Sequence, residues 1–161
     1  MREPAVTGDR FDELCEAGRA AGLDLWLHER HPRALARAEG LHLTARGEPV
    51  SGRAFGQSCH DPGELDRAFD SGARYALLSP VFRPTSKPDD DREPIGVERL
   101  VRWAAGRAVY ALGGVDPSRA TALAGAGAHG MAVLGGIFDQ PNPAAAAKMV
   151  TTLLAAWSRV T

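Results

Sequence analysis

A repeat of three local signals constrains the fold of this chain more than any other feature. Asp61-Pro62 is followed by Gly72, eleven residues after the aspartate, and then by an apolar run; Asp116-Pro117 is followed in the same way by Gly127. Aspartate and proline are typical of a helix start, and glycine of a helix end. The pattern favours a barrel of like strand–helix units, with a doubly wound sheet as the alternative.

Short apolar strands alternate with helical patterns along the whole chain, which indicates a parallel sheet. Several strands lack polar alternation, as expected for strands covered on both faces. The expected strands are Leu23–His28, Leu41–Leu43, Ala54–Cys59, Tyr75–Ser79, Ala108–Leu112 and Met131–Leu134. The expected helices are Asp9–Ala21, the two that follow Asp61 and Asp116, Glu98–Ala105 and Pro143–Val160.

The length of the chain limits how much of a barrel it can form. A chain of 161 residues holds about six strand–helix units, whereas a complete eight-unit barrel rarely has fewer than ~200 residues. We therefore expect one α/β domain over residues 1–161, folded as an incomplete (βα)8 TIM barrel.

Charge and composition argue against several kinds of partner. The 19 Lys and Arg residues nearly balance the 20 Asp and Glu residues, so the chain lacks the basic excess that nucleic-acid binding requires. No apolar run reaches the ~20 residues of a membrane span, and the start lacks the apolar stretch of a signal peptide. The two cysteines, Cys15 and Cys59, form no CxxC motif. We expect a cytoplasmic protein with reduced thiols and no membrane partner.

Two glycine pairs follow the last two expected strands. Gly113-Gly114 comes directly after one strand and Gly135-Gly136 after the next. Loops after the final strands of a parallel barrel often bind phosphate, and glycines let backbone N–H groups approach an anion closely. The pairs therefore predict a phosphate site, with tight turning alone as the alternative.

His60 ends an expected strand, where catalytic side chains of parallel barrels project. A histidine there can exchange a proton near neutral pH, although it can also simply pack on its helix. Cys59 alternates with His60 and is expected in the core. The proline-rich segment Pro80–Pro94 carries Thr85-Ser86-Lys87 and is predicted to be a long loop, either a functional lid or a solvated connector.

Four polar side chains near two strand ends raise the question of a metal site. They are His28, Glu29, His31 and His42. Neither cysteine ligands nor a helical histidine pair accompanies them, so we expect a polar cluster at the rim of the barrel and no metal.

Several of these segments resemble one known family. The order and spacing of Gly56–His60, Ser79–Lys87, Val109–Val115 and Gly130–Phe138 are similar to the thiamine-phosphate synthase and thiazole tautomerase (TenI-type) family. Upstream, Gly40–Leu43 resembles the family's fourth strand, Leu25–Arg30 its third, and Arg2-Glu3 the end of its second. The resemblance implies that units three to eight of the barrel are present, while strand one and most of strand two are missing.

The family acts on thiazole phosphate, and the resemblance implies a role for individual residues. The two glycine pairs match the positions that hold the phosphate, and the loop serine and lysine match positions that meet the second substrate or the reacting ring. The implied substrate-binding residues are Arg2, Ser58, Lys87, Gly113, Gly114, Gly135 and Gly136.

Differences from the family distinguish its two branches. The synthase branch couples an aminopyrimidine diphosphate to thiazole phosphate with Mg²⁺. It has an Asn-Asp pair where this chain has His28-Glu29, an aspartate at the place of Gly47, and a lysine at that of Pro4. Because a hard cation takes several carboxylate oxygens, and only Glu29 and Glu48 remain nearby, these changes speak against synthase activity.

The tautomerase branch needs no metal and uses a histidine at the position of His60 as its acid and base. It often has a cysteine where this chain has Ser86. The first hypothesis is therefore a tautomerase-like enzyme without a cofactor, with His60 and Ser86 as catalytic residues. A divergent Mg²⁺-dependent synthase is one alternative. A non-catalytic thiazole-phosphate-binding relative, or a truncated remnant, is the other.

An incomplete barrel of this kind has two open sheet edges, one at Leu23–His28 and one at the last strand. Each unpaired edge is a template for association with another strand. We therefore expect either a longer native product or pairing of these edges in a homo-oligomer.

Overall fold

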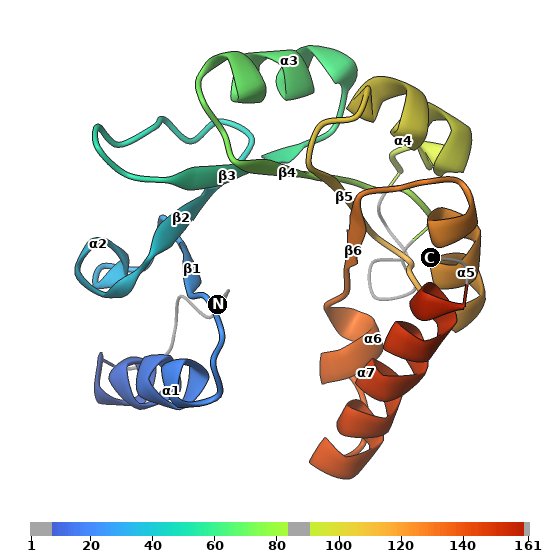
Figure 1. The fold of residues 1–161 in the computed structure, drawn as a ribbon. Coiled ribbons are helices and arrows are strands. Elements are labelled where there is room, and N and C mark those ends of the chain that lie inside the picture. Colours follow the sequence, from blue (N-terminus) through green and yellow to red (C-terminus); the bar gives the residue numbers. More distant parts are fainter. Residues whose placement is uncertain (1–7, 84–90, 160–161) are drawn as a thin grey trace.

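The computed structural model of the protein describes residues 8–83 and 91–159, and these form one curled parallel sheet with helices around it (Figure 1). The sheet has six strands in the order β1-β2-β3-β4-β5-β6, and every neighbouring pair is parallel. The strands are β1 (Trp26–His28), β2 (Gly40–Leu43), β3 (Phe55–Cys59), β4 (Tyr75–Leu78), β5 (Val109–Leu112) and β6 (Gly130–Ala132).

Helices connect the strands, and α3, α4 and α5 lie along the convex side of the curled sheet (Figure 1). None of the helices in the described ranges has the length and apolarity needed to cross a membrane. The helices are α1 (Gly8–Ala20), α2 (Ala34–Arg37), α3 (Pro62–Asp70), α4 (Gly96–Ala104), α5 (Pro117–Gly125), α6 (Gly135–Phe138) and α7 (Pro143–Ser158).

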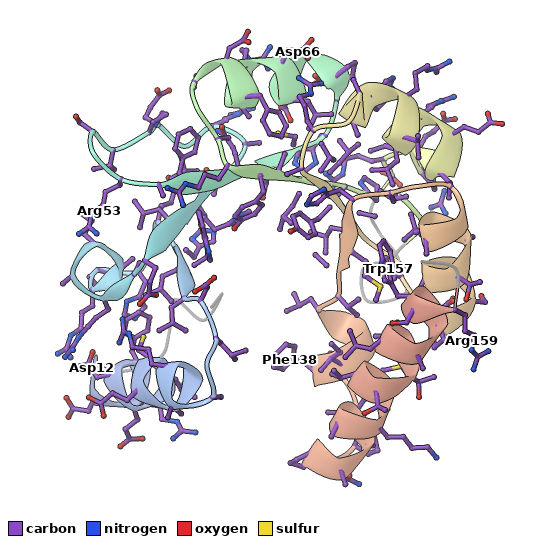
Figure 2. All side chains as sticks on the ribbon, in the orientation of Figure 1. Asp12, Arg53, Asp66, Phe138, Trp157 and Arg159 are labelled. Carbon is purple, nitrogen blue, oxygen red and sulfur yellow. The ribbon has the colours of Figure 1, made fainter. Side chains whose placement is uncertain are left out.

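The structure confirms the incomplete barrel that the sequence predicts. All six expected strands form, and β1 and β6 are the two ends of the described sheet. The sheet does not close, so the molecule has an open side between β1 and β6 (Figure 1). Phe138, at the end of α6, is 75% exposed and projects toward this open side (Figure 2).

Three local predictions were wrong. The first strand is shorter than expected, because Leu23 and Asp24 precede it as exposed residues. The last strand ends at Ala132, and the second glycine pair begins helix α6 instead of lying in a loop. The four-residue helices α2 and α6 are too short to carry a periodic apolar pattern, which is the signal that reveals longer helices.

The core lies between the outer face of the sheet and the helices. Most outward-facing strand residues are almost fully buried, because the helices cover them. Inward-facing side chains on the same strands are partly exposed, whereas the inward glycines lie buried beneath aromatic rings. Burial of each large aliphatic side chain contributes roughly 1.5–3 kcal/mol. The fully buried side chains include Leu27, Leu43, Leu78 and Val109 from the strands and Leu65, Leu100 and Leu123 from the helices.

A row of three aromatic rings crosses the inner face of the sheet. Each ring lies beside a glycine on the neighbouring strand: Trp26 pairs with Gly40, Tyr75 with Gly56 and Tyr110 with Gly130. A Cβ atom at any of these glycines would overlap the adjacent ring. The Trp26 and Tyr75 ring centroids are 5.0 Å apart, and those of Tyr75 and Tyr110 are 5.9 Å apart, both edge to face. We call Trp26, Tyr75 and Tyr110 the aromatic row.

The repeated aspartates cap their helices as the sequence predicts. The Asp61 carboxylate accepts a hydrogen bond from the Glu64 N–H at 2.8 Å, and the Asp116 carboxylate accepts one from the Arg119 N–H at 2.9 Å. The Ser118 hydroxyl donates a further bond to Asp116. Burial acts to raise the pKa of Asp116, but the hydrogen bonds from Arg119 and Ser118 and the charge of Arg119 lower it below its ordinary value.

We expect Asp116→Ala to lower the free energy of unfolding by about 1 kcal/mol at neutral pH, because the cap of α5 is lost. A carboxylate with a lowered pKa in the folded state stabilises the protein above its unfolded pKa, and this stabilisation is lost as the pH falls through the folded pKa. The difference between wild type and variant should therefore shrink in acid. Urea unfolding at several pH values, with the exposed Asp24→Ala as control, measures this. A difference that grows in acid contradicts it.

Candidate functional site

The main candidate site is a cavity on the inner face and at the carboxyl ends of the strands. Its volume is ≈ 490 Å³. The carboxyl ends of parallel strands are where barrel proteins place their ligands. Polar side chains line it beside the aliphatic Leu77, Leu112 and Leu134; they include His42, Ser58, His60, Tyr75, Ser79 and Arg92.

Local hydrogen bonds position His60 at this cavity. It follows β3 directly and precedes the Asp61 cap of α3. The Glu64 carboxylate accepts a hydrogen bond from the His60 backbone N–H at 2.7 Å, while the Glu64 N–H donates to Asp61. The start of α3 therefore fixes the backbone of His60, and its ring turns into the cavity.

The His60 ring has two polar neighbours, and geometry decides between them. Nδ1 lies 2.8 Å from the Ser79 carbonyl oxygen. Nη1 of Arg92 lies 2.8 Å from Nδ1 but also 3.4 Å from Nε2. A donor aligned with the Nδ1 lone pair would be much farther from Nε2, so the guanidinium lies out of the ring plane. We therefore assign the Nδ1 proton to the Ser79 carbonyl, which leaves Nε2 to exchange a proton with a ligand.

Ser58 also faces the cavity, two residues before His60 on the same side of β3. Its hydroxyl lies 2.9 Å from His42 Nε2, and His42 Nδ1 lies 3.0 Å from the Tyr75 hydroxyl. The three side chains come from β3, β2 and β4, which are neighbours in the sheet. Burial, and secondarily Tyr110, raises the pKa of Tyr75 to about 12, so its phenol stays protonated.

Backbone conformation and close packing explain why glycines occupy the first pair, Gly113-Gly114. Gly113 and Gly114 have φ values of 97° and 63°, which favour glycine. A Cβ at either position would press on the segment Pro80–Arg83. The Phe82 N–H donates to the Gly113 carbonyl at 3.1 Å, and Arg119 Nη1 donates to the Gly114 carbonyl. These contacts explain the glycines without a ligand and do not test the predicted phosphate role.

The second glycine pair forms the first turn of α6. Amide groups in a first helical turn lack an intrahelical acceptor. The cavity reaches Leu112 and Leu134, which directly precede the two pairs, although the four glycines themselves are not among its lining residues. The predicted phosphate site therefore lies next to the cavity, and its function stays a prediction.

Glu29, after β1, is held by the loop that follows β2. Its Oε1 accepts hydrogen bonds from the Thr44 N–H at 2.8 Å and from the Thr44 hydroxyl at 2.6 Å. A Cβ at Gly47 would overlap the Glu29 carboxylate. The carboxylate of Glu29 thus fills the space in which a side chain at residue 47 would lie.

The histidines near these strand ends separate in the structure. His28 and His42 face the cavity, with ring centroids 6.3 Å apart. The buried His31 ring instead stacks on Phe11 of α1, with centroids 3.5 Å apart. Within residues 8–83 and 91–159, no group of three or more His, Cys, Asp or Glu residues could hold a metal ion.

Three predicted site residues lie outside the described residues: Arg2, Ser86 and Lys87. Three others in the cavity were missed by the sequence analysis as site residues, namely Tyr75, Ser79 and Arg92. Every second residue of a strand faces the same side of the sheet, as Ser58 and His60 do on β3. The same alternation along β4 could have indicated that Tyr75 and Ser79 face inward. No local signal points to Arg92.

Comparison of the amino-acid sequence with known proteins identifies relatives of this chain. The sequence profile of the family described as "Thiamine monophosphate synthase" matches residues 7–137. A putative thiamine-phosphate synthase of Geobacter sulfurreducens is 32% identical over 169 aligned positions, covering 96% of this chain and 79% of that protein. The thiamine biosynthesis bifunctional protein ThiM/ThiE of Symbiobacterium thermophilum is 38% identical, covering 84% of this chain but only 30% of that longer protein.

The fold is likewise similar to a solved structure. The thiamine phosphate pyrophosphorylase from Pyrococcus furiosus superposes with a TM-score of 0.73 at 23% identity, covering 89% of this chain and 73% of that one. At this identity the likeness concerns the fold, and it agrees with the incomplete barrel.

Cys59 is expected to be chemically inert, although it adjoins the site. It is 1% exposed on the outer face of β3. Burial, and then the charges of Glu64 and Asp61, raises the pKa of its thiol to about 12. Because the thiolate is the reactive form, neither Cys59 nor the buried Cys15 should react with a disulfide reagent at pH 8 in the folded protein. Both should react after unfolding in guanidinium. Rapid labelling of one thiol in the folded protein would contradict this.

Proposed function

Because this chain belongs to the thiamine monophosphate synthase family, we propose that it acts in thiamine biosynthesis and joins a thiazole phosphate to an aminopyrimidine diphosphate. The observation that carries the proposal is the cavity at the carboxyl ends of the strands, with Ser58 and His60 on its wall and the glycine pairs beside it. The relative of Geobacter, most of whose length this chain covers, carries synthase activity in its name. The relatives therefore favour this reaction over the tautomerase reaction.

The residues take the following roles in this proposal. The amide groups of the glycine pairs bind the phosphate of the thiazole, so that its ring reaches the cavity. Ser58 hydrogen-bonds a substrate ring, and the guanidinium of Arg92 brings positive charge toward the diphosphate. Arg2 and Lys87 keep the substrate-binding roles that the family resemblance implies.

Magnesium is the cofactor that the synthase branch implies, but the described residues do not fit a magnesium site of their own. The synthase branch has an Asn-Asp pair where this chain has His28-Glu29, so Glu29 is the one carboxylate at these two positions. Its Oε1 already accepts hydrogen bonds from Thr44. Residue 47 supplies no side chain. Mg²⁺ is bound by one or two carboxylates together with substrate phosphates and water, so a single bonded carboxylate does not make a site for the free ion.

Partners and location follow from the same reaction. The substrates are small molecules, and neither a nucleic acid nor a membrane takes part. We place the reaction in the cytoplasm. Association of the open edges of β1 and β6 in a homo-oligomer stays a prediction.

We expect the purified protein to form thiamine phosphate from thiazole phosphate and aminopyrimidine diphosphate. Reactions with and without Mg²⁺, followed by fluorescence after oxidation to a thiochrome, measure the product. Omission of either substrate is the control. A folded protein that yields no thiamine phosphate with or without Mg²⁺ would refute the proposed reaction.

A tautomerase is the second candidate, and one observation favours it. The Ser79 carbonyl binds Nδ1–H of His60, which leaves Nε2 as the acid and base that moving a ring proton requires. Ser86, the second catalytic residue of this hypothesis, lies outside the described residues.

If this candidate is right, His60→Ala should slow tautomerisation of a thiazole carboxylate phosphate by about 10²- to 10⁴-fold, because a positioned acid–base group is lost. NMR of the substrate ring measures the rate. The exposed His129→Ala is the matched control, because this histidine contacts Tyr110 and is not among the residues that line the cavity. Equal rates for wild type and His60→Ala, with both folded, would exclude His60 from this role.

A further inference from the structure

Three side chains on neighbouring strands form a hydrogen-bonded chain that ends in the cavity. It runs from the Tyr75 hydroxyl through the His42 ring to the Ser58 hydroxyl, with distances of 3.0 and 2.9 Å. We propose that Tyr75 and His42 are positioning residues, and that they present the Ser58 hydroxyl as a hydrogen-bond donor to a ring acceptor of a heteroaromatic substrate. The identity of the substrate rests on the proposed function. The arrangement of the protons between Tyr75, His42 and Ser58 is argued from the structure alone.

The position of the Tyr75 hydroxyl is fixed by its surroundings. The ring lies against Gly56 and between Trp26 and Tyr110 in the aromatic row. The His42 ring stacks nearly parallel to it, at 13° and a centroid distance of 5.8 Å. These contacts leave the phenol little freedom to turn away from His42.

Between these three side chains, the protons can be arranged in two ways while His42 is neutral. In the first, Tyr75 donates to Nδ1 and Nε2–H donates to Ser58. In the second, Nδ1–H donates to Tyr75 and Ser58 donates to Nε2. Among the described residues, His42 is the one hydrogen-bond partner of the Tyr75 hydroxyl. The second arrangement would leave the phenol proton without an acceptor there, so the first is favoured.

The first arrangement decides what Ser58 can recognise. Because the serine oxygen accepts the proton of His42, its own O–H is directed to a further acceptor. That acceptor is a ring nitrogen of a ligand in the cavity, which can use the serine proton while His42 donates to the oxygen. If His42 takes up a second proton, Nε2–H still donates to Ser58, so the hydroxyl remains a donor.

The proton arrangement can be measured without any substrate. Long-range ¹⁵N–¹H NMR of the histidine rings distinguishes Nε2–H from Nδ1–H. We expect His42 as the Nε2–H tautomer in wild type, and a shift toward Nδ1–H in Tyr75→Phe, because the phenol donor is lost. Tyr110→Phe removes the hydroxyl of a neighbouring ring in the aromatic row, outside the hydrogen-bonded chain, and should leave the tautomer unchanged. A wild-type Nδ1–H tautomer would overturn the proposal.

A double-mutant cycle tests the effect on binding. We expect Ser58→Ala to weaken binding of one of the two substrates, thiazole phosphate or aminopyrimidine diphosphate, measured separately by calorimetry. Tyr75→Phe should raise the Kd of that same substrate about three- to tenfold, as for the loss of one hydrogen bond. In the Ser58→Ala background, Tyr75→Phe should have no further effect, because its influence passes through Ser58.

Each other outcome has a distinct meaning. If Tyr75→Phe weakens binding equally in both backgrounds, the Tyr75 hydroxyl acts on the ligand independently of Ser58 and the positioning role is wrong. If Ser58→Ala changes the binding of neither substrate that wild type binds, Ser58 is not the donor. If wild type binds neither compound, the proposed function fails, and the NMR measurement alone decides whether Tyr75 and His42 set the Ser58 proton.

Discussion

Contact between aromatic rings and glycines on the inner face of the sheet is the interaction on which the rest of the structure depends. The rings of the aromatic row come from strands β1, β4 and β5, yet Trp26 and Tyr75 touch although two strands separate them. They can meet because Gly40 and Gly56, on the intervening strands, carry no side chain. The strands can therefore curl around the row, which gives the sheet its barrel curvature without a complete barrel.

The aromatic row also forms part of the cavity wall, because Trp26 and Tyr75 line the cavity. Toward the carboxyl ends of the strands, polar side chains line the cavity together with these two rings. Successive residues of a strand point to opposite faces, so one strand contributes both to the core and to the cavity. Cys59 is buried in the core, while Ser58 and His60, on either side of it in the sequence, face the cavity. The residue with the raised thiol pKa and the residues proposed to act on substrate are sequence neighbours on opposite faces.

The sequence was sufficient to predict the features that depend on local chemistry. The caps at Asp61 and Asp116 and the six strands follow from residue type and spacing alone, and the length of the chain indicated that the barrel would be incomplete. The sequence could not reveal contacts that depend on strand register, such as His42 with Tyr75, or on a loop returning to the site, such as Arg92 with His60. Helix α6 was not predicted, because a helix of four residues is too short to show a repeated apolar pattern.

The fit between Glu29 and Gly47 also limits how the site can evolve. A side chain gained at residue 47 would require the end of the Glu29 side chain to shift, and a shorter acid at residue 29 would leave empty space beside the glycine. Each of these single changes therefore disturbs an arrangement that the other residue completes. The carboxylate of Glu29 and a side chain at residue 47 therefore compete for one space, so a substitution at either position changes the surroundings of the other.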